Sequence, residues 1–141
     1  MPRTIALKGD FIRKEAIASS AITPGHLIEF GGAHDLQPHS TVGGPARKAF
    51  ALENDLIGRD FDAAYAGGEQ VQYGVFVPGA EVYALLDGHE EGCTKGEPLE
   101  SAGNGNLQVS STPVEASVVA WALETITIAS SVTARVKVEV N

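Results

Sequence analysis

Two alternating apolar runs joined by a Pro-Gly pair stand out in the middle of the chain. Residues 70–77 and 80–86 place apolar side chains at every second position on either side of Pro78 and Gly79. This period of two is typical of strands in a half-buried β-sheet. The pair predicts a turn, because proline fixes a negative φ and glycine accepts a positive one. Proline does not suit the first central position of a tight hairpin, so we expect a longer bulged turn or a corner between two sheets.

A second alternating run lies near the end of the sequence. Four valines and one alanine occupy every second position of residues 132–140, with polar side chains between them. This pattern predicts a strand with one buried and one solvated face. The preceding run, residues 118–128, is the most apolar of the chain, and its first half also fits a helix. Its β-branched second half favours one strand buried on both faces, with Trp121 as the largest core or interface residue.

Shorter apolar segments, separated by glycine and proline, predict the remaining strands. They lie near residues 2–7, 21–30, 36–42 and 46–53, and a hairpin is expected between Leu99 and Leu107. Phe30 is expected in the core. Residues 11–20 fit either a weak helical turn or an irregular lead-in. Together the runs predict about eight to ten short strands in one domain, a mainly β fold of the sandwich or barrel type.

Composition narrows the class of protein. The only cysteine is Cys93, so the chain forms no intrachain disulfide, which fits synthesis in a reducing cytoplasm. The N-terminal residues lack the apolar segment of a secretory signal, and the longest uncharged apolar stretch, residues 116–123, is too short to span a bilayer. We therefore expect no membrane partner.

Charge is distributed unevenly along the chain. The net charge of −8 argues against a nucleic-acid binder held by phosphate contacts. Residues 1–14 carry four basic side chains and one acidic, a net charge of +3, whereas the rest carries six basic and seventeen acidic, a net charge of −11. A basic head on an acidic body suggests a tail that docks on an acidic surface. A solvated, frayed terminus is the alternative.

The residue types that carry chemistry are scattered. His34 and His39 share one glycine-rich loop, and His89 precedes two glutamates and Cys93, but neither group has a metal-ligand spacing. We expect solvated histidines, no metal and no cofactor. Glutamates near Cys93 raise a thiol pKa, which disfavours a nucleophile. The chain also lacks the common nucleophile-elbow, phosphate-loop and zinc-protease motifs.

Three other residues are functional candidates. Glu124 stands in an apolar run and is the best candidate for a perturbed carboxylate, although pairing with Arg135 or Lys137 on the following strand explains it more simply. Phe76 and Trp121 are candidate interface anchors, and core positions explain them equally well.

The order of short motifs in roughly residues 49–140 resembles the capsid decoration (cement) proteins of tailed phages, the lambda-like head decoration family. The motifs are Gly-Gly-Glu-Gln-Val at 67–71, Val-Pro-Gly-Ala-Glu-Val at 77–82, Lys-Gly-Glu-Pro-Leu-Glu-Ser at 95–101, Gly-Asn-Gly-Asn-Leu at 103–107, Ala-Leu-Glu at 122–124 and the valine-alternating end. Residues 1–48 match the family less clearly.

This resemblance implies a β-tulip or barrel-like domain over residues 19–141 and an extended capsid-binding arm over residues 1–18. It implies a homotrimer on the outer surface of the virion, made in the host cytoplasm, that binds the major capsid protein at threefold and quasi-threefold axes and stabilises the expanded head. It implies no catalysis and no nucleic-acid contact. The arm residues expected to bind are Pro2, Arg3, Thr4, Ile5, Ala6, Leu7 and Lys8. Strand addition by such an arm needs little sequence specificity, and we expect deletion of residues 1–14 to leave a folded trimer that no longer binds.

Two other classes of protein stay open. The first is a small trimeric β-barrel nucleotide hydrolase, whose carboxylates would come from Asp60, Asp62 and Glu81. The second is a surface carbohydrate-binding module, whose aromatic platform would come from Tyr65, Tyr73 and Tyr83.

Overall fold

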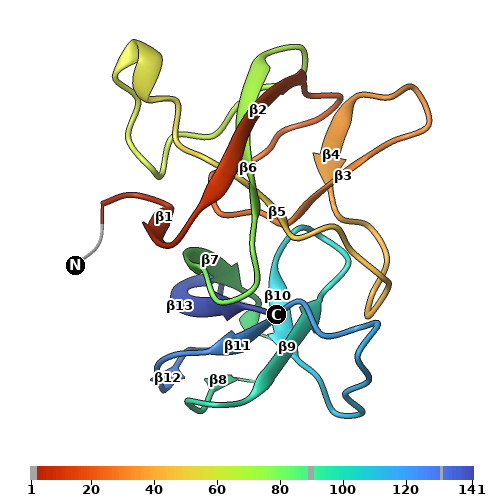
Figure 1. The fold of residues 1–141 in the computed structure, drawn as a ribbon, viewed down its shortest axis with the longest axis vertical. Helices are drawn as coiled ribbons and strands as arrows, with labels where there is room; N and C mark the ends of the chain where they lie inside the picture. The colour runs from red at the N-terminus through yellow and green to blue at the C-terminus, as the bar shows by residue number, and fades with distance from the viewer. Residues whose placement is uncertain (1–2, 89–90, 131) are drawn as a thin grey trace.

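The computed structural model describes residues 3–88, 91–130 and 132–141 and shows a mainly β fold (Figure 1). One short 3₁₀-helix, η1 (Asp55–Ile57), interrupts the strands. The strands are β1 (Ala6–Lys8), β2 (Phe11–Ile17), β3 (Ile28–Phe30), β4 (Leu36–Pro38), β5 (Ala49–Ala51), β6 (Gln70–Phe76), β7 (Glu81–Leu86), β8 (Gly92–Cys93), β9 (Pro98–Ser101), β10 (Leu107–Val109), β11 (Ala120–Ala122), β12 (Ile126–Thr127) and β13 (Ala134–Val140). No helix in the described parts of the chain has the length and apolar character needed to cross a bilayer.

Five strands close into a small barrel. Its order is β7-β10-β9-β11-β13, and β13 returns to pair with β7, so the sheet has no free edge along this circuit. The β7–β10 pair is parallel and the other four are antiparallel. Strand β1 adds to the start of β7, where Ala6 faces Val82. The valines of β13 at 136, 138 and 140 are buried, as the alternation predicts.

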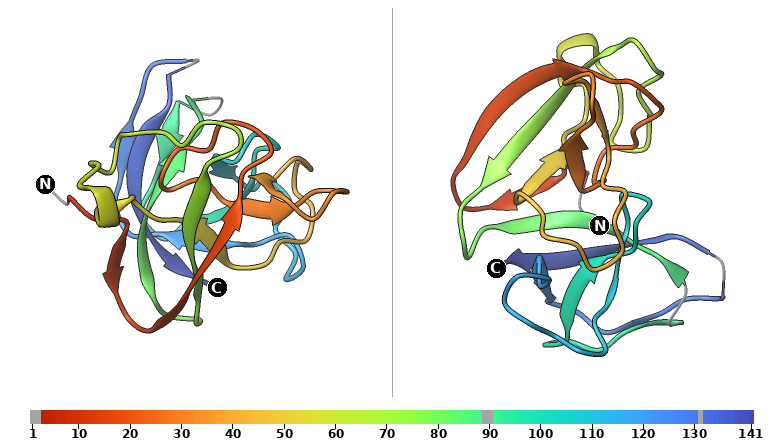
Figure 2. Two further views of the ribbon diagram at one scale, coloured as in Figure 1. Left: turned by 90° about the horizontal axis from the view of Figure 1, so that it is seen from above. Right: turned by 90° about the vertical axis from the view of Figure 1, so that its right-hand side faces the viewer.

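A second region lies beside the barrel. Its three-stranded sheet has the order β2-β6-β5, and the β3–β4 pair packs next to it. The right-hand view of Figure 2 shows this region above the barrel, with the chain crossing from β6 to β7 at one side. The crossing is at Pro78 and Gly79, which confirms the predicted corner between two sheets. Gly79 has φ +91° and donates its N–H to the carbonyl of Val140 (2.9 Å), so the corner is tied to the last barrel strand.

The two regions share one domain because β6 lies between two apolar cores. Phe76 belongs to the larger core, which fills and covers the barrel, whereas Val71 and Tyr73 belong to a smaller core under the β3–β4 pair. Gln72 on the other face is also buried, with 3% of its surface exposed. The prediction of a half-buried strand is therefore wrong for β6: both of its faces are covered.

Three local predictions differ from the structure. Residues 11–17 form a strand, because they pair with all seven residues of β6 and tertiary pairing overrides a weak local preference. Residues 118–128 form two short strands, β11 and β12, in different sheets. Phe30 is 42% exposed and lies outside the core. The hairpin between Leu99 and Leu107 is confirmed as β9–β10, with Gly103 and Gly105 both at φ +85°.

Candidate functional site

The segment predicted to be a capsid-binding arm lies on the body of the protein. Ile5 is fully buried in the larger core, and its carbonyl accepts the N–H of Tyr83 at 2.8 Å. Its own N–H donates to Glu53 Oε2 at 3.1 Å. Arg3, Thr4 and Lys8 are exposed, Ala6 and Leu7 are half-buried, and Pro2 lies outside the described residues. The extended conformation is as expected, and the segment packs against parts of the body that are distant from it in sequence.

The basic side chains of this segment help to explain why it lies on the body and does not extend from it as a free arm. Three ion pairs join it to the body: Arg3 with Asp60 (3.3 Å), Lys8 with Glu81 (3.8 Å) and Arg13 with Asp55 (3.5 Å). Opposite charges attract, so a basic head on an acidic body is drawn inward. Each pair is largely solvated and contributes only about 0–1 kcal/mol. The segment is therefore held in place mainly by the burial of Ile5 and by the pairing of β1 with β7 and of β2 with β6.

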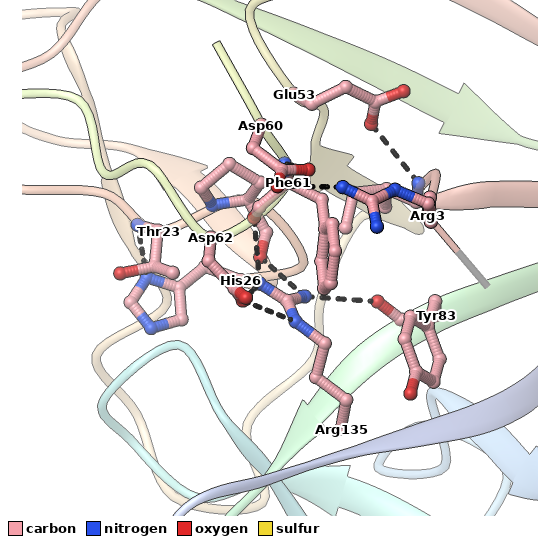
Figure 3. Close-up of polar contacts among 11 residues, drawn as sticks. Arg3, Thr23, His26, Glu53, Asp60, Phe61, Asp62, Tyr83 and Arg135 are labelled. Carbon is pink, nitrogen blue, oxygen red and sulfur yellow. Dashed lines mark hydrogen bonds and ion pairs between the residues drawn. The ribbon is translucent and has the colours of Figure 1, made fainter. Parts of the chain in front are cut away.

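Arg135 joins the barrel to the loops beside this segment, and Figure 3 shows its contacts. Its side chain is only 9% exposed, although its position in β13 predicted a solvated face. Nη1 donates to the carbonyl of Pro24 and Nη2 to that of Phe61, both at 2.8 Å. Nη2 also forms an ion pair with Asp62 at 3.1 Å. The guanidinium lies over the rings of Phe61 (4.8 Å) and Tyr83 (5.8 Å), which adds a cation–π contribution.

The loop around Gly25 is shaped to admit Arg135. Gly25 has φ +96°, and a Cβ there would lie 2.6 Å from Nη1 of Arg135. Next to it, His26 Nδ1 accepts the N–H of Thr23 at 3.1 Å. Burial, followed by the charge of Arg135, lowers the pKa of His26 to about 4. His26 is therefore neutral near pH 7, and this cluster joins the barrel to the loop around Gly25.

The two candidate interface anchors have different environments. Phe76 is 4% exposed and stacks on Phe11 with ring centroids 4.9 Å apart, so it is a core residue. Trp121 on β11 is 37% exposed, and its Nε1–H donates to Asn141 Oδ1 at 3.1 Å. A surface hollow of about 410 Å³ adjoins the indole; its lining is Pro113, Val114, Glu115, Val118, Trp121 and Asn141. Of the two, only Trp121 is available to a partner.

Two of the remaining candidates, His39 and Glu124, form hydrogen bonds within the protein. His39 is buried, with Nδ1 2.7 Å from Ser101 Oγ and Nε2 3.1 Å from the carbonyl of Pro45. Glu124 Oε1 accepts the backbone N–H of Lys137 at 3.1 Å. His34 is exposed, whereas His89 lies outside the described residues. Within residues 3–88, 91–130 and 132–141, no three His, Cys, Asp or Glu side chains are grouped to hold a metal ion.

Cys93 is buried in the barrel region. Burial is the main cause that raises the pKa of its thiol, and Glu97 and Glu124 raise it further. The predicted direction is thus right, although the neighbouring glutamates are the smaller cause.

The candidate residues of the two alternative classes are buried or ion-paired. The three tyrosines of the carbohydrate hypothesis are buried: Tyr65 (1% exposed), Tyr73 (4%) and Tyr83 (5%). They present no aromatic platform. The three carboxylates of the hydrolase hypothesis are each paired with a cation: Asp60 with Arg3, Asp62 with Arg135 and Glu81 with Lys8.

The fold defines a class of small β proteins in which a closed five-stranded barrel carries a second, open sheet. No known family profile matches the chain, and no curated protein matches it by sequence. Among solved structures, it is similar to the crystal structure of the head fiber gp8.5 N base in bacteriophage phi29. The TM-score is 0.62 at 12% sequence identity, over 94% of this chain and 95% of that chain. The likeness establishes a shared fold over nearly the whole chain; membership of the lambda-like decoration family stays a prediction.

Proposed function

We propose that this chain is a non-catalytic structural protein of a phage head, attached to the outside of the shell. The observation that carries the proposal is the likeness to a head fiber base over 94% of the chain, which includes both the barrel and the open sheet. The motif order in residues 49–140 supports the same kind of protein independently of that comparison.

The attachment surface is proposed to include β2 as a fixed strand edge in place of a free arm. Among the described residues β2 pairs with β6 alone, and residues 12–15 of β2 are exposed. Ile12, near its start, is 63% exposed. An extended segment of the major capsid protein can pair with such an edge through main-chain hydrogen bonds. Lys14 on the strand disfavours unspecific pairing and favours an acidic partner.

The Trp121 hollow is proposed as the contact between copies in a homotrimer. Tryptophan is among the side chains that most often dominate interfaces, and an exposed one beside Pro113 and Val114 offers a compact apolar patch. Placing self-association at β11 and shell contact at β2 uses opposite parts of the molecule, the barrel and the open sheet. Attachment through three copies would turn a weak strand contact into firm retention.

Co-sedimentation with purified heads of the source phage tests the proposal. We expect the protein to bind expanded heads in a saturable manner and to raise the temperature at which they release their genome. Ile12→Asp is expected to weaken binding strongly, whereas Lys95→Asp, also exposed, serves as the matched control. Trp121→Ala is expected to give monomers in sedimentation velocity while retaining weak binding. Absence of the chain from purified virions, or equal binding by all three variants, would contradict it.

A further inference from the structure

The smaller core is open at one side. A cavity of about 260 Å³ lies between the β3–β4 pair and the β2-β6-β5 sheet. Its lining is Ile28, Glu29, Phe30, Leu36, Arg47, Ala49 and Tyr73. Four of these side chains also belong to the smaller core, so the floor of the cavity is that core itself. The volume is below the roughly 300–1,000 Å³ of small-molecule sites, and it suits one inserted side chain.

Aromatic rings shape one wall of this groove. Phe30 meets Tyr73 edge-on, with ring centroids 6.3 Å apart, and remains 42% exposed. The guanidinium carbon of Arg47 lies 5.7 Å from the centroid of Phe30. An entering ring would therefore find an exposed aromatic neighbour with a cation beside it.

The adjoining sheet surface extends the groove toward β2. Ile12 pairs with Val75 and Lys14 with Tyr73, so these side chains lie on the same face of the sheet as the cavity floor. Ile12 is 63% exposed and Val75 is half-buried. Apolar surface thus continues from the cavity to the outer strand.

The charges around the groove are positive and available. Across the described parts of the chain, Arg47 and Lys14 form no ion pair, whereas five other cations do: Arg3, Lys8, Arg13, Arg59 and Arg135. The one acid of the lining, Glu29, is already engaged. Its Oε1 accepts hydrogen bonds from Gln37 Nε2 (2.9 Å), the Ser40 N–H (3.0 Å) and Ser40 Oγ (2.5 Å). On a molecule of net charge −8, this apolar groove therefore has a cationic rim.

We infer that the groove binds a short segment of a protein partner in which an aromatic or branched aliphatic side chain is flanked by carboxylates. The apolar side chain fills the cavity against Phe30 and Tyr73, and a flanking carboxylate meets Arg47, with Lys14 as the second cation. The inference goes beyond shell attachment and does not depend on it, because the cavity and its rim are properties of the isolated chain.

An NMR titration with a defined probe tests this inference. The probe is a capped heptapeptide with the sequence Gly-Ser-Asp-Phe-Asp-Ser-Gly, added to the ¹⁵N-labelled full chain. We expect saturable shifts for the backbone amides of residues 28–30, 47–49 and 73–75. The same peptide with asparagine in place of both aspartates should bind roughly threefold to tenfold more weakly, as expected for partly solvated ion pairs.

Variants assign the binding to the groove. Phe30→Ala should weaken binding at least about tenfold, and Arg47→Glu should do so by a similar factor, without loss of the folded spectrum because both side chains are exposed. Lys95→Glu changes the same charge on the barrel side and should leave binding unchanged. Three outcomes would overturn the inference: no saturable shifts, equal binding by Arg47→Glu, or a self-associated species in sedimentation that Phe30→Ala dissolves, which would make a second copy the occupant.

Discussion

The barrel and the open sheet are both built from short strands, but they differ in how many of the strand edges and side chains are covered. In the barrel every strand of the circuit has two neighbours, and its enclosed valines and leucines are fully buried. In the β2-β6-β5 sheet the outer strand has a free edge, Phe30 and Ile12 are exposed, and the smaller core opens into a cavity. A closed sheet removes edges and leaves little for a partner to pair with. The difference suggests that the barrel supplies stability and the open sheet supplies recognition.

Deleting residues 1–14 should have the largest effect, because this segment belongs to both regions. It would remove β1 from the barrel side, the buried Ile5 and the Phe11–Phe76 stack. We expect loss of more than about 5 kcal/mol and an unfolded or molten chain, in contrast to the folded trimer that the sequence suggested. A well-dispersed NMR spectrum from the truncated chain would show that the two regions are stable without it.

Paired leucine substitutions compare the two cores directly. Leu99→Ala in the barrel should cost about 3–5 kcal/mol, because the site is enclosed and cannot collapse. Leu36→Ala should cost about 2–3 kcal/mol, since its side chain already borders a cavity. Chemical denaturation gives both values. Equal costs would mean that the smaller core is as closed as the larger one.

Replacing Arg135 tests how firmly the regions are joined. Arg135→Met keeps the apolar stem but leaves the carbonyls of Pro24 and Phe61 without their donor, at a cost of about 2–3 kcal/mol. The control is Asp62→Asn. Its side chain is 71% exposed, so we expect a loss below about 1 kcal/mol. If the two variants lost the same stability, the ion pair and not the carbonyl contacts would hold the junction.

The smallest expected effect is a pH dependence at the same junction. The native pKa of His26 is about 4, below the unfolded value of 6.5. As pH falls below 6.5 the unfolded state takes up a proton that the native state does not, so stability decreases until the pH approaches 4. His26→Asn should therefore flatten the stability profile, by about 2 kcal/mol between pH 7 and pH 5. Parallel profiles for the two proteins would show that His26 is not protected from protonation.

Local patterns predicted the strands that have a two-residue period of their own. Residues 70–76, 81–86 and 134–140 have apolar side chains at every second position, and all three are strands. Backbone geometry limited the joint at Pro78 and Gly79 to a bulged turn or a corner, and the corner is seen only once β6 and β7 are placed in different sheets. By contrast, β2 is a strand only because β6 lies beside it, and no local feature of its polar residues shows this.

The candidate surfaces were harder to predict, because exposure depends on what packs above a residue. Phe76 and Phe30 are both aromatic residues of apolar runs, yet one is buried beneath Phe11 and the other borders a groove. Arg135 occupies a polar position of an alternating strand, and only the approach of the loop at Gly25 turns it into a buried cation. In the sequence, Pro24 and Gly25 indicated only a turn, and nothing there showed that the turn admits Arg135.

Closure of the barrel also fixes when this chain can finish folding. The strand that completes the circuit, β13, pairs with β7, whose residues precede it by about fifty positions. Until residues 134–140 leave the ribosome, β7 and β11 each lack β13 as a neighbour. The apolar side chains of the barrel interior are then incompletely covered. Such long-range pairing is slow and leaves strand edges exposed to aggregation during synthesis. The appearance of β13 thus converts an association-prone intermediate into a chain whose barrel circuit has no free edge.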